Sequence, residues 1–430
     1  MIVQTTKANQ VKNTTHKVVI PFYVYAGISF LVATVLLFLS AHSFTGHYFQ
    51  PGTLAVTHTM ALGWGTMMIL GASHQLVPVL IESRLYSTLL AYSSFILAAI
   101  GIPMLVVSFF SFQFDWMAIT GAILINAAVM SFLINIALSM WYAPVRNVHA
   151  VFVITAILWL LVTTLIGLLL VCNFSHSILS SGSLHYLSLH AHIGIIGWFL
   201  LLVIGVGSRL IPMFLISKYH DIKSLWTIYG LINGGLIIFI TFFLLNAGNS
   251  WFLVPIALIA IALILFGCFC FMAYEQRIRK QVDEQMQVSV LSIAMMGLPI
   301  VFLCILIIVV IRSGNPSAKD VLAYGFSIFF GWLTAIIFGM TFKTLPFIVW
   351  NKVYHDKAGL GKTPNPKELF SGRIFNSMAV SYLFGFLLFI VGILMVNYII
   401  LQVTTFLLII TACLYNWNII KMLMHKPMVK

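Results

Sequence analysis

The sequence predicts an all-α polytopic membrane protein with twelve transmembrane helices in three pseudo-threefold four-helix units. Three observations predict this class: an apolar composition, twelve hydrophobic runs of membrane-spanning length, and a motif that occurs three times at equal spacing. Of the 430 residues, 61% are hydrophobic and 7% are charged, and the mean hydropathy is +1.08. Soluble domains carry about 25% charged residues, so this composition excludes an ordinary cytosolic domain, a nucleic-acid-binding module and a disordered chain.

A bilayer core about 30 Å thick requires roughly 20 apolar residues per helix. In chain order, we expect the helices over residues 19–41, 53–80, 85–110, 117–141, 150–172, 187–215, 224–246, 251–273, 289–312, 321–349, 374–397 and 400–423. The connectors are short, which predicts a single membrane domain over residues 19–423. A polar segment (1–18), which lacks the features of a cleavable signal peptide, and a short tail (424–430) flank this domain, and both are expected in the cytoplasm.

The distribution of basic residues predicts the orientation. The N-terminal segment, the loops after the even-numbered helices and the tail, counted with Arg209 and Lys343 near the adjacent helix ends, hold 20 of the 22 Lys and Arg residues. The opposite side holds only Arg312 and Lys319. Cytoplasmic segments of membrane proteins are rich in Lys and Arg, so we expect both termini on the cytoplasmic side of a bacterial-type inner membrane. The net charge of +13 lies on that side. There it faces anionic lipid, the expected partner, and indicates no nucleic acid.

The second, sixth and tenth helices share a motif whose first residues are His58, His192 and Phe326, with 134 residues in each step. Counted from that first residue, each copy has Gly at +5, Trp at +6, Gly at +13, a long polar residue at +17 and Pro at +20. The repeat predicts three successive units, over about residues 19–141, 150–273 and 289–423.

Within each copy, the Trp at +6 and the Gly at +13 lie on one stripe of a regular helix. A small residue in such a stripe lets another helix or a flat cofactor approach closely. Gly71, Gly205, Trp64 and Trp198 are therefore candidate cofactor-binding residues. Helix packing explains the same residues equally well.

Histidine is unusually frequent: the chain has 13 His and only nine carboxylates. A His within a membrane is a functional candidate, because an unpaired imidazole is costly in hydrocarbon, and neutral imidazole binds haem iron, copper and zinc. The candidate metal ligands near the expected outer face are His58, His185, His190 and His192. For His58 and His192, which share one repeat position, ligation is favoured over a structural hydrogen bond. His190 and His192 lie about 200° apart around a regular helix and are expected to face different surroundings.

Twelve spans, units of four helices, and His residues on the outer parts of helices 2 and 6 resemble subunit I of the haem-copper oxidases. Residues 58–78 and 190–212 look like the signatures of divergent bacterial members, including NnrS-type proteins tied to nitric oxide stress. The resemblance implies that His58 is an axial ligand of a haem, of b-type, and that His192 binds copper. It also implies a cytochrome c or quinol electron donor and further oxidase-like subunits as partners.

The chain departs from this family in its ligands and its charges. The tenth helix has no His where the family supplies two haem ligands, and residues 224–246 lack the family's His pair for copper. All nine carboxylates are expected at helix ends or in loops, which argues against proton pumping through buried carboxylates.

The leading hypothesis is therefore a membrane haem or haem-copper protein in electron transfer, or in oxygen or nitric oxide chemistry at the outer side. As an enzyme it would be an oxidoreductase without the full proton-pumping machinery. The alternative is a transporter or a metal- or haem-handling protein without redox turnover, because internal repeats and helices with Gly and Pro also occur in transporters. A structural subunit that has lost its cofactors is a third reading, since Phe326 stands in one repeat in place of His.

Overall fold

The computed structural model describes residues 15–144, 147–278, 280–355 and 363–427. All the secondary-structure elements in these ranges are helices. Twelve of these helical segments are long and apolar enough to cross a membrane, and each expected span is confirmed with its ends shifted by at most five residues. The first 14 residues of the expected N-terminal segment and residues 428–430 of the expected tail lie outside the described residues.

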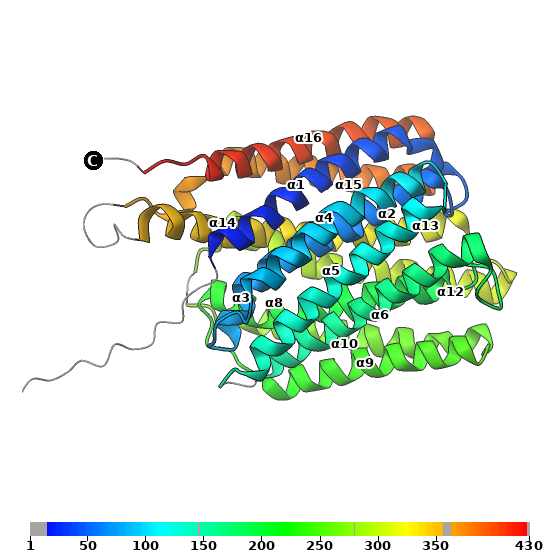
Figure 1. Ribbon diagram of the computed structural model, residues 1–430, viewed down its shortest axis with the longest axis horizontal. Coiled ribbons are helices and arrows are strands. Elements are labelled where there is room, and N and C mark those ends of the chain that lie inside the picture. The colour runs from blue at the N-terminus through cyan, green and yellow to red at the C-terminus, as the bar shows by residue number, and fades with distance from the viewer. Residues whose placement is uncertain (1–14, 145–146, 279, 356–362, 428–430) are drawn as a thin grey trace, which may run out of the picture.

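The spans are, in chain order, α1 (His16–Leu39), α2 to α3 (Pro51–Leu80), α4 (Thr88–Phe110), α5 (Trp116–Trp141), α6 (Val148–His176), α7 to α8 (Leu187–Leu215), α9 (Ile222–Leu244), η4 to α10 (Asn249–Glu275), α11 to α12 (Glu284–Ser313), α13 to α14 (Ala318–Tyr354), α15 (Gly372–Leu394) and α16 (Tyr398–Leu423). They run roughly parallel to the long axis of the molecule (Figure 1). The beginning of α1 and the end of α16 lie at the same end of the bundle, as an even number of spans requires.

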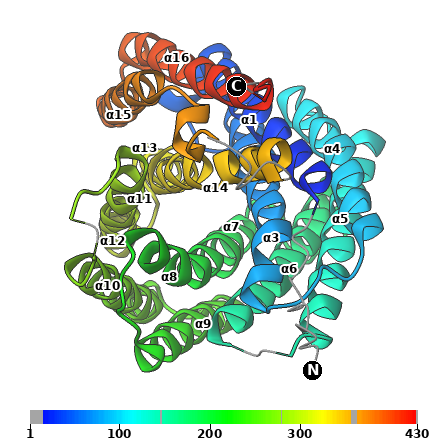
Figure 2. The same ribbon diagram turned by 90° about the vertical axis from the view of Figure 1, so that its left-hand side faces the viewer.

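Three spans form the centre of the bundle, and they are the three that carry the repeated motif. We call Pro51–Leu80, Leu187–Leu215 and Ala318–Tyr354 the inner helices. Seen end-on, they lie inside a ring formed by the other helices (Figure 2). In their most apolar stretches 78, 56 and 83% of the residues are buried, against 22 to 50% in the other spans.

Each inner helix contains a π-helical segment that begins directly after the first residue of the motif. The segments are Thr59–Thr66, Ile193–Leu200 and Ser327–Leu333. A π turn contains more residues than an α turn and is often found at functional sites. Because a wider turn changes the direction of the side chains, the regular-helix geometry assumed from the sequence does not hold over this stretch.

The inner helices are linked to one another by Trp–Thr hydrogen bonds. The indole N–H of Trp64 donates to Thr334 Oγ1 at 3.1 Å, and the indole N–H of Trp198 donates to Thr66 Oγ1 at 3.1 Å. In each bond a residue at +6 of one copy contacts the residue at +8 of another. These matching contacts and π segments favour three equivalent units, and the grouping itself stays a prediction.

The glycines at +13 lie at helix contacts. A Cβ atom on Gly71 would lie 2.6 Å from Cβ of Phe22 in α1, and one on Gly205 would lie 2.3 Å from Cβ of Phe152 in α6. Such distances are shorter than any normal carbon contact. The two glycines therefore let an outer helix pack directly on an inner helix.

Candidate functional site: two ring pairs in an apolar cavity

A cavity of about 700 Å³ is bordered by all three inner helices and by parts of several outer helices. The inner helices contribute lining residues from their first halves. The charge distribution predicts that these halves lie toward the outer side. Its lining is mainly aliphatic and aromatic, and none of the described residues that line it is Asp, Glu, Lys or Arg. Ligand sites in proteins commonly have volumes of about 300–1,000 Å³ and few polar groups, so this cavity has the size and character of one.

His58 and His190, which we call the first ring pair, lie together at this cavity. Their ring centroids are 6.4 Å apart and their planes are inclined by 16°. His58 also packs against Phe109 of α4, with centroids 4.4 Å apart. His190 lies over Gly167 of α6, where a Cβ atom would come within 3.0 Å of the imidazole. The two imidazoles are thus held in place by outer helices on either side.

The hydrogen bonds of the first ring pair determine which nitrogen of each ring is free. Nδ1 of His58 is 2.9 Å from the carbonyl oxygen of Leu54, and Nδ1 of His190 is 3.1 Å from that of Thr163. A carbonyl can only accept, so in both rings Nδ1 carries the proton and Nε2 of the neutral imidazole carries a lone pair. A hydrogen bond from one ring nitrogen to a carbonyl is the usual support for a metal-ligating His.

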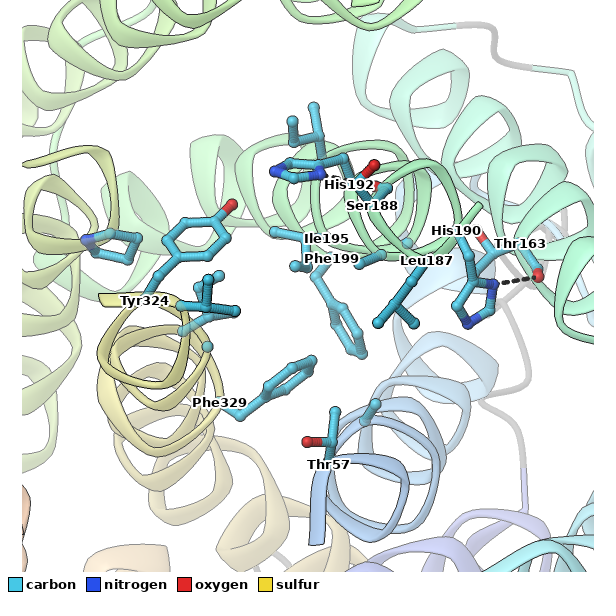
Figure 3. A pocket seen from close by; sticks show the side chains of 18 of the residues that line it. Thr57, Thr163, Leu187, Ser188, His190, His192, Ile195, Phe199, Tyr324 and Phe329 are labelled. Carbon is cyan, nitrogen blue, oxygen red and sulfur yellow. Dashed lines mark hydrogen bonds between the residues drawn. The ribbon is translucent and has the colours of Figure 1, made fainter. Parts of the chain in front are cut away.

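His192 and Tyr324 form the second ring pair. Their centroids are 5.9 Å apart with planes inclined by 24°, and Phe239 of α9 lies 5.0 Å from the His192 ring. Nδ1 of His192 donates to the carbonyl of Ser188 at 2.7 Å, so its Nε2 is the acceptor. Figure 3 shows His192 and Tyr324 on one side of the cavity and His190 on the other side of the same helix. The expectation that His190 and His192 face different surroundings therefore agrees with the structure.

The third copy of the motif has no polar ring at the corresponding place. Phe326 stacks on Phe330 at 4.7 Å and on Phe389 of α15 at 4.3 Å, and Phe386 lies 5.9 Å away with its ring nearly parallel. This phenyl stack fills the contact between the inner helix and its outer neighbour.

The ring pairs follow a single rule in the repeat. In the first pair, His58 is the first residue of one copy and His190 lies two residues before the first residue of the next copy. In the second pair, His192 and Tyr324 have the same relation. The two ring pairs therefore occupy equivalent places between consecutive inner helices, with a phenol in the second where the first has an imidazole.

The four His expected as metal ligands do not gather at one point. His185 precedes α7, is exposed, and packs against Phe243 at 5.2 Å without lining the cavity. The described residues contain no group of three or more His, Cys, Asp and Glu that could hold a metal ion. In the described part of the chain the four His are therefore not gathered around one point: His190 and His192 face different sides of one inner helix, and His185 lies outside the cavity.

Of the four candidate cofactor-binding residues other than His, only one lines the cavity. Trp198 lines the cavity, whereas Trp64 is fully buried and stacks on Phe30 at 4.8 Å without lining it. Gly71 and Gly205 do not line the cavity either. Of the two explanations open for these glycines, helix packing fits their contacts, and the approach of a flat cofactor at these positions does not.

Sequence reasoning missed Tyr324 as a site residue. The available signal was its place two residues before Phe326, which matches the place of His190 before His192. Sequence reasoning also did not predict that His58 pairs with His190. The two rings come from different helices, and the spacing of residues within one helix does not show how two helices pack.

The first ring pair fits the haem that the resemblance implies: His58 and His190 would bind its iron through the lone pairs of Nε2, and the apolar lining would surround it. At 6.4 Å the rings leave no space for a third ring stacked between them, because two such contacts need at least about 7 Å. A ligand shared by the two imidazoles would therefore have to meet them through their Nε2 atoms.

Comparison with known proteins found no family model and no curated protein that matches this chain.

Proposed function

We propose that this protein is a membrane haem protein in which His58 and His190 hold the cofactor, in electron transfer or in oxygen or nitric oxide chemistry at the outer side. The observation that carries the proposal is the first ring pair. Both imidazoles have Nδ1 fixed on a backbone carbonyl, both line an apolar cavity of about 700 Å³, and their centroids are 6.4 Å apart. Bound haem would supply an iron centre that accepts and releases one electron.

The protein's own residues have separate tasks in this proposal. His58 and His190 bind and orient the group through Nε2, and the carbonyls of Leu54 and Thr163 keep each ring in the tautomer that ligation requires. The apolar lining excludes water. Copper is the second candidate ligand, because two neutral imidazoles also suit this metal.

The positions of the charged side chains favour a haem protein over a transporter. Transporters place ionisable groups at the substrate site near the middle of the membrane. The buried ion pair between Lys343 and Asp283 lies toward the opposite end of the inner helices from the cavity, where Asp283 caps the start of α11. The lining of the cavity itself carries no charge among the described residues.

The test is the visible absorption spectrum of the purified protein, with metal analysis, after expression with haem precursor and copper supplied. We expect a Soret band in the wild-type protein and its loss in His58→Phe and His190→Phe, since each variant removes one ligand and keeps the ring volume. His185→Phe is the matched control, because His185 lies outside the cavity, and its spectrum should be that of the wild type.

Absence of both haem and copper from the well-folded wild-type protein would overturn the proposal and leave the cofactor-free alternatives. A Soret band that survives in both His58→Phe and His190→Phe would also contradict it, because the ligands would then lie elsewhere.

A further inference from the structure

The second ring pair is a site that the haem proposal does not use. Tyr324 is only 9% exposed, and its hydroxyl has no hydrogen-bond partner among the described residues. Nε2 of His192 likewise has none within the described part of the chain, because its hydrogen bond to Ser188 uses Nδ1. Polar groups in such an apolar environment are normally paired. The pair therefore presents one donor and one acceptor to the cavity without a protein partner for either.

The surroundings limit what could bind there. The described residues near the pair offer no third metal ligand, so two rings alone do not make a metal site. The lining of the cavity carries no charge in the described part of the chain, which favours a neutral ligand. Apolar residues of α10 and α12, such as Ile259 and Leu303, extend the lining toward the outer ring of helices. A ligand with an apolar body would be stabilised there by burial.

The geometry of the rings indicates how such a ligand would approach. At 5.9 Å the rings of His192 and Tyr324 are too close to admit another ring between them, since that needs at least about 7 Å. The ligand must therefore meet them with a polar edge. A neutral hydroxyl can do both with a single atom, donating to Nε2 of His192 and accepting from the hydroxyl of Tyr324. Phe239, 5.0 Å from His192, offers an aromatic wall for a flat body.

We propose that the second ring pair binds a neutral, flat, membrane-soluble phenol-type compound, whose hydroxyl is held between His192 and Tyr324. This site uses other residues than the haem proposal, on the opposite side of the same inner helix, and both ring pairs border one cavity. The phenyl stack around Phe326 leaves the third equivalent place without such a site.

The test compares two probes that differ by one hydroxyl: 1-naphthol and naphthalene. The full chain is placed in lipid nanodiscs, binding is measured by equilibrium dialysis, and partition into empty nanodiscs of the same lipid is subtracted. We expect saturable binding of 1-naphthol, about fivefold tighter than that of naphthalene, which is the effect of roughly one net hydrogen bond.

Tyr324→Phe removes only the hydroxyl and should weaken 1-naphthol binding about fivefold with no change for naphthalene. His192→Phe should have the same selective effect, and it introduces the residue that the third repeat carries at this position. His185→Phe is the matched control: His185 is exposed and does not line the cavity, so this variant should keep 1-naphthol binding at the wild-type level.

No saturable binding of 1-naphthol above that of empty nanodiscs would overturn the proposal. Equal affinity of folded Tyr324→Phe and wild type for 1-naphthol would overturn it as well. A loss of bound metal or haem in His192→Phe with unchanged 1-naphthol binding would contradict it by making the second ring pair a metal site. Each of these results is separable from failure of the haem proposal, which is read from the spectra of the His58 and His190 variants.

Discussion

At the scale of single residues, the glycines at +13 determine how closely outer and inner helices approach. Gly205 faces the Cβ of Phe152 at a distance that leaves no space for a methyl group, and this Phe is fully buried. In a membrane, where lipid is as apolar as the side chains, helix association depends on such close packing. A methyl group here must move α6 away from the inner helix, and the contacts on both sides of the glycine would loosen together.

We therefore predict that Gly205→Ala destabilises the protein by about 1–3 kcal/mol, the usual cost of overpacking. Gly230→Ala in α9 is the matched control, since no atom lies within 4 Å of the Cβ it would add, and it should be neutral or stabilising by up to about 1 kcal/mol. Unfolding of both variants by SDS titration in mixed micelles measures the difference. Equal stability of Gly205→Ala and the wild type would show that α6 can yield at this contact.

The same residues show what sequence can and cannot predict about a site. Equal spacing identified His58 and His192 as equivalent, and this equivalence holds in the structure, where each begins a ring pair. Their partners could not be derived in the same way. His190 reaches His58 because the carbonyl of Thr163, on another helix, fixes its ring. That contact depends on how two helices pack, which one-dimensional spacing does not contain.

At the scale of elements, Trp–Thr hydrogen bonds link the three inner helices at two of three equivalent places. Two indole N–H groups at +6 donate to Thr hydroxyls at +8 of another inner helix. By the same rotation, the N–H of Trp332 should meet residue 200, where the chain has Leu. Trp332 is 3% exposed, lines the cavity, and donates no hydrogen bond to any described residue. The centre of the bundle thus has two of three possible bonds.

We predict that Leu200→Thr restores the third hydrogen bond. Both Leu200 and its neighbour Leu201 are nearly fully buried, so a Thr at either place loses similar apolar burial. Only the Thr at 200 should gain the indole as a partner, and Leu200→Thr should therefore cost about 1 kcal/mol less than Leu201→Thr.

A double-mutant cycle with Trp332→Phe isolates this bond. In the Trp332→Phe background the difference between the two Thr variants should disappear, because the donor is gone. The free energies of unfolding again come from SDS titration. A difference that persists without the indole would mean that Leu200 and Trp332 are not paired in the way the repeat implies.

At the scale of the whole molecule, the first residue of the motif makes a different ring contact in each of the three copies. His58 pairs with an imidazole and His192 with a phenol of the next inner helix, whereas Phe326 stacks on rings of its own helix and of the outer helix α15. The helix number and the inner position of the repeat helices were predictable, because length, hydropathy and the Trp–Gly–Pro pattern are local properties. The π segments were not, since the residues of Thr59–Thr66, Ile193–Leu200 and Ser327–Leu333 have no composition in common that marks a wider turn.

The orientation of the bundle decides from which side the ring pairs are reached. The inner helices begin at the end that holds the cavity, and 20 of the 22 basic residues are predicted at the other end. Because basic loops remain on the cytoplasmic side, we predict that the cavity lies toward the outer side. Green fluorescent protein fused to the C-terminus should fluoresce, and alkaline phosphatase inserted between α4 and α5 should be active. The same insertion between α8 and α9, next to Lys218, should be inactive. The reverse pattern would place both ring pairs on the cytoplasmic side, where a phenol-type ligand or an electron donor would have to come from inside the cell.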